Sequence, residues 1–104
     1  MARVPFGYEI EGSRLVINED EAAVVRRIFA EFTRPYFHTG LSEIAADLNA
    51  DGIPTQRGGH WFASTVRYIL GNQVYASEPR AIITRGAYEQ AQNRLNTMRK
   101  GPTR

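Results

Sequence analysis

The chain has 104 residues and no cysteine. A disulfide framework and a zinc site built from thiolates are therefore excluded, and a reducing compartment such as the cytoplasm is expected. Histidine is also scarce. His38 and His60 are the two present, and neither has other metal ligands at the spacing of a metal site. The sequence therefore predicts no metal ion and no other bound cofactor.

Long apolar runs are missing too. No stretch approaches the about 18 consecutive apolar residues of a membrane span, and no charged segment followed by an apolar one marks a signal peptide. We therefore expect a protein that works in the cytoplasm and not in a membrane.

Catalytic motifs are equally absent. The four serines (Ser13, Ser42, Ser64 and Ser77) lie in no G-x-S-x-G elbow, and neither an H-E-x-x-H motif nor a P-loop is present. Neighbouring carboxylates gather at 19–21, where the start of a helix explains them better than acid–base chemistry does. We therefore predict that this chain catalyses no reaction by itself and takes no small-molecule substrate.

Charge is present in both signs but is unevenly distributed. Residues 1–51 hold nine acidic residues and five arginines, a net charge of −4, whereas residues 52–104 hold seven arginines and one lysine against two glutamates, a net of +6. This asymmetry favours an anionic partner for the second half. Two solvated faces of opposite sign are the alternative interpretation.

The first elements are indicated by short-range patterns. Apolar residues alternate from Phe6 to Ile10 and again from Leu15 to Ile17, which predicts a β-hairpin with a three-residue loop at 11–13. Because an isolated hairpin is marginally stable, it should pack on the helices that follow.

The first helix is predicted from Asn18, the expected cap, to Thr33 or Arg34, just before Pro35. Glu21 should complete a capping box with Asn18. Five apolar residues at helical spacing form its inner stripe: Ala22, Val25, Ile28, Phe29 and Phe32. Arg26, Arg27 and Glu31 lie off this stripe and should face solvent.

Three further helices follow. One should run from Leu41 to about Ala50, with Gly52 as a left-handed cap. The next should run from about Ala63 to Gly71 with its inner face made by Phe62, Val66, Ile69 and Leu70, and Trp61 should lie in the core. After an extended run at 81–83, Thr84 should cap a last helix of roughly 85–99. The predicted fold is α+β: a small, mostly helical domain with an N-terminal β-hairpin and a central helix-turn-helix.

The helices at 41–50 and 63–71 are arranged as a helix-turn-helix reader of DNA requires. The loop at 54–61 exceeds the about three or four residues of a minimal turn, so it should contact DNA as well. Its polar residues and glycines, with the outward front of the second helix, are the candidate DNA contacts: Thr55, Gln56, Arg57, Gly58, Gly59, His60, Ser64, Thr65, Arg67 and Tyr68. For Arg57 the alternative is an ordinary exposed arginine, and for Tyr68 an aromatic residue half-buried against a neighbouring helix.

The residues also match a family pattern along nearly the whole chain. The matching segments, in order, are PFGY at 5–8, LV at 15–16, EAAVVRRIF at 21–29, EIA at 43–45, LN at 48–49, GIPT at 52–55, RGG at 57–59, Trp61, STV at 64–66, IL at 69–70, Asn72 and VY at 74–75. This pattern resembles the "recombinase" domain of large serine recombinases. In one departure from it, Phe62 stands where the family often has a polar cap, which leaves Ser64 as a second possible start for that helix.

The resemblance implies that residues 1–104 form a single recombinase-type DNA-binding domain. It also implies a longer parent protein, with a catalytic resolvase-like domain upstream and a zinc-ribbon domain downstream, both absent from this chain. The predicted function is sequence-specific binding of double-stranded DNA within a serine recombinase, such as a phage integrase or a transposon resolvase. A stand-alone helix-turn-helix regulator and a protein-interaction module with a basic docking face are the alternatives.

Overall fold

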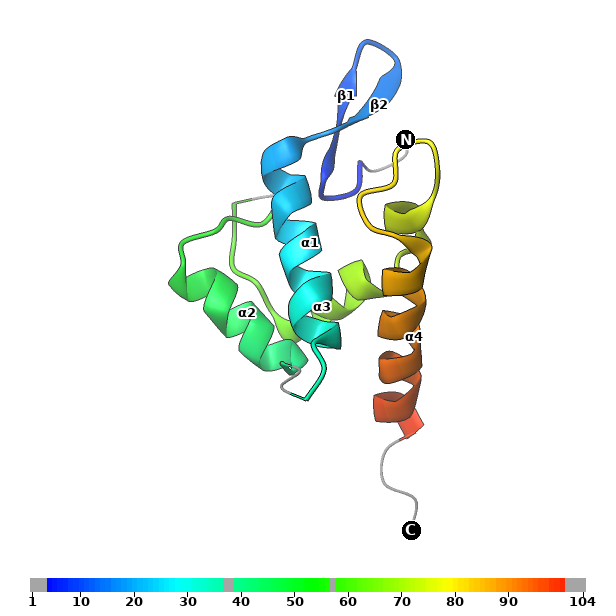
Figure 1. Ribbon diagram of the computed structural model, residues 1–104. Helices are drawn as coiled ribbons and strands as arrows, with labels where there is room; N and C mark the ends of the chain where they lie inside the picture. Colours follow the sequence, from blue (N-terminus) through cyan, green and yellow to red (C-terminus); the bar gives the residue numbers. More distant parts are fainter. Residues whose placement is uncertain (1–3, 37–38, 57, 101–104) are drawn as a thin grey trace.

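A computed structural model describes residues 4–36, 39–56 and 58–100 of the chain (Figure 1). Its elements are β1 (Tyr8–Glu11), β2 (Arg14–Ile17), α1 (Glu19–Thr33), α2 (Leu41–Ala50), α3 (Ala63–Leu70), the short 3-10 helix η1 (Gln73–Ala76) and α4 (Arg85–Lys100). Helix α1 runs through the middle of the domain, with α2 on one side and α4 on the other, and α3 passes behind it and contacts all three of these helices. The predicted fold, a small helical domain with an N-terminal hairpin, is confirmed. Within the described ranges, no helix is both long and apolar enough to span a membrane.

The hairpin is tighter than predicted. Tyr8 pairs with Ile17 and Glu11 pairs with Arg14, so the turn contains two residues, Gly12 and Ser13, and the predicted three-residue loop is wrong. Gly12 has φ +67. A positive φ in a two-residue turn matches the twist of the paired strands, which explains why the shorter turn is favoured.

The start of α1 is tied to the N-terminal segment. Asn18 caps the helix as predicted, since its Oδ1 accepts from the Glu21 amide at 3.1 Å. Glu21 does not complete the capping box, however: its carboxylate accepts from the Gly7 amide at 2.8 Å, and the Asn18 amide donates to the Gly7 carbonyl at 2.9 Å. The helix start thus satisfies both backbone groups of Gly7.

Gly7 occupies a position that favours glycine. Its φ is +104, and a Cβ there would lie 3.0 Å from Cδ1 of Ile82 and 3.3 Å from Cγ2 of Val25. Both the backbone conformation and the close packing therefore disfavour a side chain.

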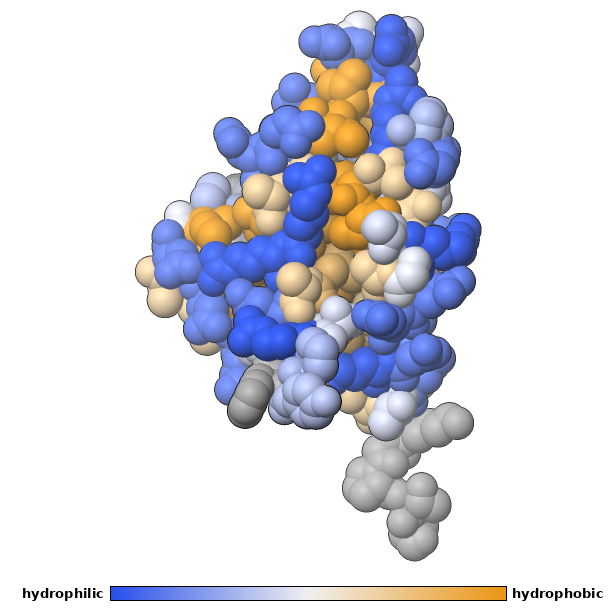
Figure 2. Space-filling view, viewed as in Figure 1, coloured by the Kyte–Doolittle hydropathy of each residue, from blue (hydrophilic) through white to orange (hydrophobic). Residues whose placement is uncertain are grey.

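The core surrounds α1, and all five residues of its predicted stripe are buried. Two tyrosines join the N-terminal segment to the segment after α3: the Tyr75 hydroxyl donates to the Phe6 carbonyl at 2.6 Å, and the Tyr8 hydroxyl donates to the Arg80 carbonyl at 2.7 Å. Their rings stack with centroids 6.0 Å apart. In the view of Figure 1, apolar surface forms a strip from the hairpin to the centre and a smaller patch at the left of the molecule, and most of the remaining surface is hydrophilic (Figure 2).

The segment at 81–83 is not extended as predicted. The amides of Ile82 and Ile83 both donate to the Tyr75 carbonyl, at 2.8 and 3.0 Å, so the chain bends here while Ile82 enters the core. The last helix begins behind Thr84 as predicted, since the Thr84 hydroxyl accepts from the Ala87 amide at 3.0 Å.

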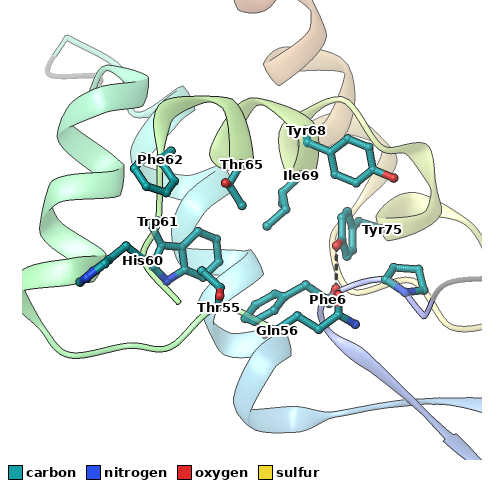
Figure 3. Close-up of a pocket in the computed structure, with 11 residues that line it drawn as sticks. Phe6, Thr55, Gln56, His60, Trp61, Phe62, Thr65, Tyr68, Ile69 and Tyr75 are labelled. Carbon is teal, nitrogen blue, oxygen red and sulfur yellow. Dashed lines mark hydrogen bonds between the residues drawn. The ribbon is translucent and has the colours of Figure 1, made fainter. Parts of the chain in front are cut away.

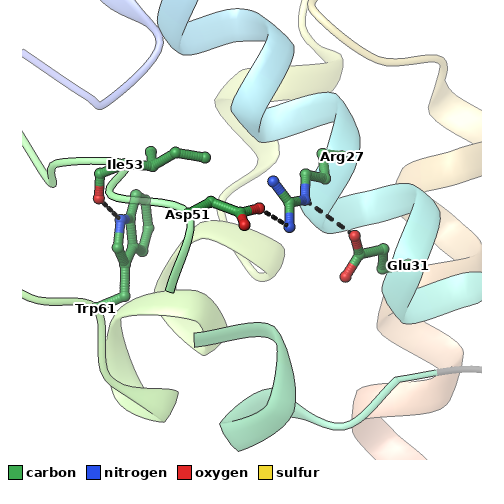
Figure 4. A network of polar contacts seen from close by, with 5 residues as sticks. All are labelled: Arg27, Glu31, Asp51, Ile53 and Trp61. Atoms are coloured by element: carbon green, nitrogen blue, oxygen red, sulfur yellow. Dashed lines mark hydrogen bonds and ion pairs between the residues drawn. The ribbon is translucent and has the colours of Figure 1, made fainter. Parts of the chain in front are cut away.

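Two arginines of α1 that were predicted to face solvent also connect elements. Arg27 forms ion pairs with Glu31 at 3.0 Å and with Asp51 at 2.8 Å, which links α1 to the end of α2 (Figure 4). Hydrogen bonds to these two carboxylates raise the pKa of Arg27. Arg26 donates from Nε to the Ile82 carbonyl at 3.1 Å. Arg26 is exposed as predicted although it also makes this contact, whereas Arg27 and Glu31 are only partly exposed, so the prediction that they simply face solvent is wrong for these two.

On α4, Arg94 also turns inward. Its Nη1 donates to the carbonyls of Phe32 at 2.7 Å and Thr39 at 3.0 Å, and its guanidinium lies 4.2 Å from the centre of the Phe32 ring. Burial lowers the pKa of Arg94. This residue fixes α4 to the end of α1.

Candidate nucleic-acid interface

Helix α3 is positioned from α2 through Asn49 and Trp61. The Asn49 side chain donates to the Trp61 carbonyl at 2.9 Å and accepts from the Trp61 amide at 2.8 Å. The Trp61 indole donates to the Ile53 carbonyl at 2.9 Å (Figure 4) and meets the Phe6 ring edge-on, 5.2 Å between centroids. Trp61 is 2% exposed, so its prediction as a core residue is confirmed. The loop is thus fixed at both ends, and the start of α3 is held in place.

The loop between α2 and α3 contains a tight turn built on Thr55. The Thr55 hydroxyl accepts from the Gly59 amide at 2.9 Å, and the Gly58 amide donates to the Thr55 carbonyl at 2.9 Å. Gly58 has φ +80 and is exposed. The Gln56 side chain donates to the Val4 carbonyl. The turn therefore exposes backbone groups to solvent. Arg57, a predicted DNA contact in this loop, lies outside the described residues.

Helix α3 has the two faces that the sequence predicts, with one exception. Val66, Ile69 and Leu70 are buried, and Ser64 and Tyr68 are exposed. Phe62 was predicted on the inner face, yet 63% of it is exposed. It precedes α3 in extended conformation, φ −129, so the helical periodicity does not apply to it. The helix starts at Ala63 and not at Ser64, and it ends one residue before Gly71.

Half of the candidate contacts meet at one open cleft of about 430 Å³ between α3, the loop and the N-terminal segment (Figure 3). Its lining residues are Pro5, Phe6, Thr55, Gln56, His60, Trp61, Phe62, Thr65, Tyr68, Ile69 and Tyr75. None of these described residues carries a carboxylate. The His60 imidazole points away from Thr65 and Tyr68. The cleft therefore offers hydroxyl and amide groups and aromatic walls, without an acid that would repel an anionic ligand.

Arg67 lies on the other flank of α3. It lines a second groove with Tyr68, Gly71, Asn72, Gln73 and Tyr88. Tyr68, 70% exposed, borders both hollows and so marks the crest of the helix. Helix α4 supports this end of α3, because Gln92 donates to the Leu70 carbonyl at 2.6 Å. Ser64 and Arg67 are therefore not part of the cleft, and Phe62 is the lining residue whose exposure the sequence pattern missed.

Comparison with known proteins agrees with this architecture. Residues 19–79, from α1 to just beyond η1, match the family model described as "Recombinase". The chain belongs to the Recombinase family. The resemblance drawn from the sequence is thereby confirmed. The matched residues include the loop and all of α3, so the cleft is largely built from the part that defines the family.

Two relatives of this Recombinase-family domain are informative. A "Putative DNA recombinase" of Bacillus subtilis (strain 168) is 36% identical over 95 residues, which cover 84% of this chain and 19% of that protein. A solved structure described as "Crystal Structure of a LSR-DNA Complex" superposes with a TM-score of 0.74 at 22% identity, covering 94% of this chain and 32% of that one. The first supports the family and the second the fold. The chain spans about a fifth and a third of their lengths.

Proposed function

We propose that this chain is the DNA-binding domain of a serine site-specific recombinase, such as a phage integrase or a transposon resolvase. The observation that carries the proposal is the acid-free cleft beside α3, where Thr55, Gln56, His60, Thr65 and Tyr68 meet. Family membership supports a role in recombination, and the relative of the same fold is a complex with DNA. The excess of arginine after residue 51 supplies the matching charge.

In this proposal α3 enters the major groove, which is wide enough to admit a helix. Tyr68 at the crest points to the base edges, with Thr65 and Arg67 on the two flanks. The exposed glycine turn at 58–59 and Arg57 then follow the phosphate backbone, because glycine lets the main chain approach it closely. Arg67 reads a base, and a guanidinium pairs best with guanine.

The domain serves to hold a parent enzyme on its site. In the parent chain a catalytic domain cuts and exchanges strands and a zinc-ribbon domain adds further contacts, while this domain contributes binding and acts in the cytoplasm. The much greater lengths of the two relatives support a larger parent. The domain alone should therefore leave supercoiled DNA uncut.

The salt dependence of binding to duplex DNA tests the proposal. If the domain neutralises about four to six phosphates, its affinity should fall with a log–log slope of roughly −4 to −5 as salt rises. The measurement is fluorescence anisotropy with labelled duplexes of random and selected sequence. An affinity that does not change between low and moderate salt would exclude nucleic acid as the partner.

A further inference from the structure

Phe62 occupies a position that a different residue would fill better for stability. It is the residue preceding the first turn of α3, with φ −129 and ψ 161, and its side chain makes no capping hydrogen bond. Ser, Thr, Asp or Asn is strongly preferred there, because its side chain accepts from a free amide of the first turn. Helix α3 therefore begins without a side-chain cap.

The phenyl ring of Phe62 contributes little to the stability of the core. With 63% of the residue exposed, it keeps most of its apolar surface in water, unlike its neighbour Trp61. Figure 3 shows the ring at the rim of the cleft, beside Thr65 and at the end of α3 opposite Tyr68. Residues that break a local rule without stabilising the fold are expected at functional sites.

The surroundings of Phe62 indicate what it contacts. The cleft it borders is lined by hydroxyl, amide and aromatic groups, without a carboxylate among the described lining residues. If α3 lies in the major groove, the first apolar group that an exposed ring just ahead of its first turn meets is the 5-methyl group of thymine. We infer that Phe62 is a specificity-determining residue that reads a thymine methyl group in the bound site. This inference rests on the proposed function.

The test removes the methyl group from the DNA and the ring from the protein. Duplexes selected by the wild-type chain from a random library are resynthesised with deoxyuridine replacing thymidine, one position at a time. At one or two positions the wild-type affinity should fall roughly four-fold, the value expected for a lost buried methyl group. For Phe62→Ala the same substitutions should change affinity less than about 1.5-fold, because the ring that contacts the methyl is gone.

Two further variants separate the contact from the fold. Phe62→Ser supplies the missing cap, so it should unfold at the same or a higher urea concentration while losing the response to deoxyuridine. Tyr36→Ala removes an aromatic residue that is 93% exposed and lies outside the cleft lining, so it should keep the wild-type response.

The outcomes are distinguishable. Salt-insensitive binding, or no enriched sequence, would refute the proposed function itself. Sequence-specific binding in which wild type and Phe62→Ala respond alike to every deoxyuridine would refute only the role of Phe62. That result, with Phe62→Ala binding the selected DNA as tightly as wild type, would also exclude Phe62 from the DNA contact altogether.

Discussion

The side chain of Asn49 bonds both backbone groups of Trp61, donating to its carbonyl at 2.9 Å and accepting from its amide at 2.8 Å. Asn49 lies in the last turn of α2, and Trp61 lies two residues before α3. The two helices of the helix-turn-helix are thus joined by a side chain and not by the loop alone.

Replacing Asn49 by Ala should therefore loosen the presentation of α3. It leaves two backbone groups of Trp61 without partners, so the free energy of unfolding should fall by about 1–3 kcal/mol. Urea denaturation measures this change. Asn93→Ala is the matched control, because Asn93 is exposed on α4, and it should lower stability by less than about 0.5 kcal/mol. Equal stability of the Asn49 variant and wild type would contradict the assigned role.

Gly7 and Gly12 allow backbone strain to be separated from crowding. Both have positive φ, but a Cβ at Gly12 meets nothing within 4 Å, whereas one at Gly7 lies 3.0 Å from Ile82. Gly12→Ala should cost roughly 1–2 kcal/mol for the conformation alone. Gly7→Ala should cost roughly 1–3 kcal/mol more, because the core must also shift. Thermal and urea unfolding of both variants measure the difference. Equal losses of stability would show that the side chains around Gly7 can move to accommodate a Cβ at no cost.

Arg67 and Arg57 should affect DNA binding in different ways. Arg67→Ala should weaken binding to the selected site by about 1–3 kcal/mol and relax the preference at one base pair. Arg57→Ala should weaken selected and random duplexes about equally and reduce the salt slope by about one. Both proteins should stay folded, and Arg14→Ala, exposed on the hairpin, is the control. If Arg67→Ala left affinity and discrimination unchanged, α3 would not be the reading helix.

The buried Tyr75 predicts a loss of stability in alkaline solution. Burial raises the pKa of Tyr75 above its ordinary value of 10.0. A group whose pKa is raised by folding stabilises the fold fully below the pKa of the unfolded chain, and this contribution is lost as the pH rises toward the folded pKa. Stability should thus hold up to about pH 9 and decline above about pH 10.

Tyr75→Phe checks this assignment. It should be less stable near neutral pH by about 1–3 kcal/mol, because the Phe6 carbonyl loses its donor. Its decline above about pH 10 should be shallower than that of wild type, with Tyr8 supplying part of what remains. Urea unfolding across the alkaline range measures both effects, and parallel curves would rule out Tyr75 as the titrating group.

Local signals predicted the elements well, because their causes lie within a few residues. Asn18 and Pro35 bracket α1 in the sequence, and the helix runs from Glu19 to Thr33 as expected. The left-handed residue after α2 was likewise predicted, since Gly52 has φ +73. Helix α3 and the candidate contacts on it followed from the same periodicity.

What the sequence did not reveal depends on contacts between distant residues. Arg94 reaches the Phe32 carbonyl across 62 positions of the chain, and Glu21 reaches Gly7 across 14 in preference to the cap beside it. Phe62 was misplaced for another reason: it lies outside the helix whose periodicity was applied to it. The missing polar cap was the one sequence signal that pointed to its exposure.

A count of net charge does not distinguish an arginine that can bind a phosphate directly from one that acts only through its charge. The inward position of Arg94 makes this distinction. Its Nη1 donates to two carbonyls, and its guanidinium lies over the Phe32 ring. Nη1 therefore cannot bind a phosphate without breaking the contact between α4 and α1. Its positive charge still acts through the solvent over about a Debye length. In the proposed function, Arg94 therefore belongs with the charges that speed the encounter with DNA, whereas α3 and its loop set the lifetime of the complex.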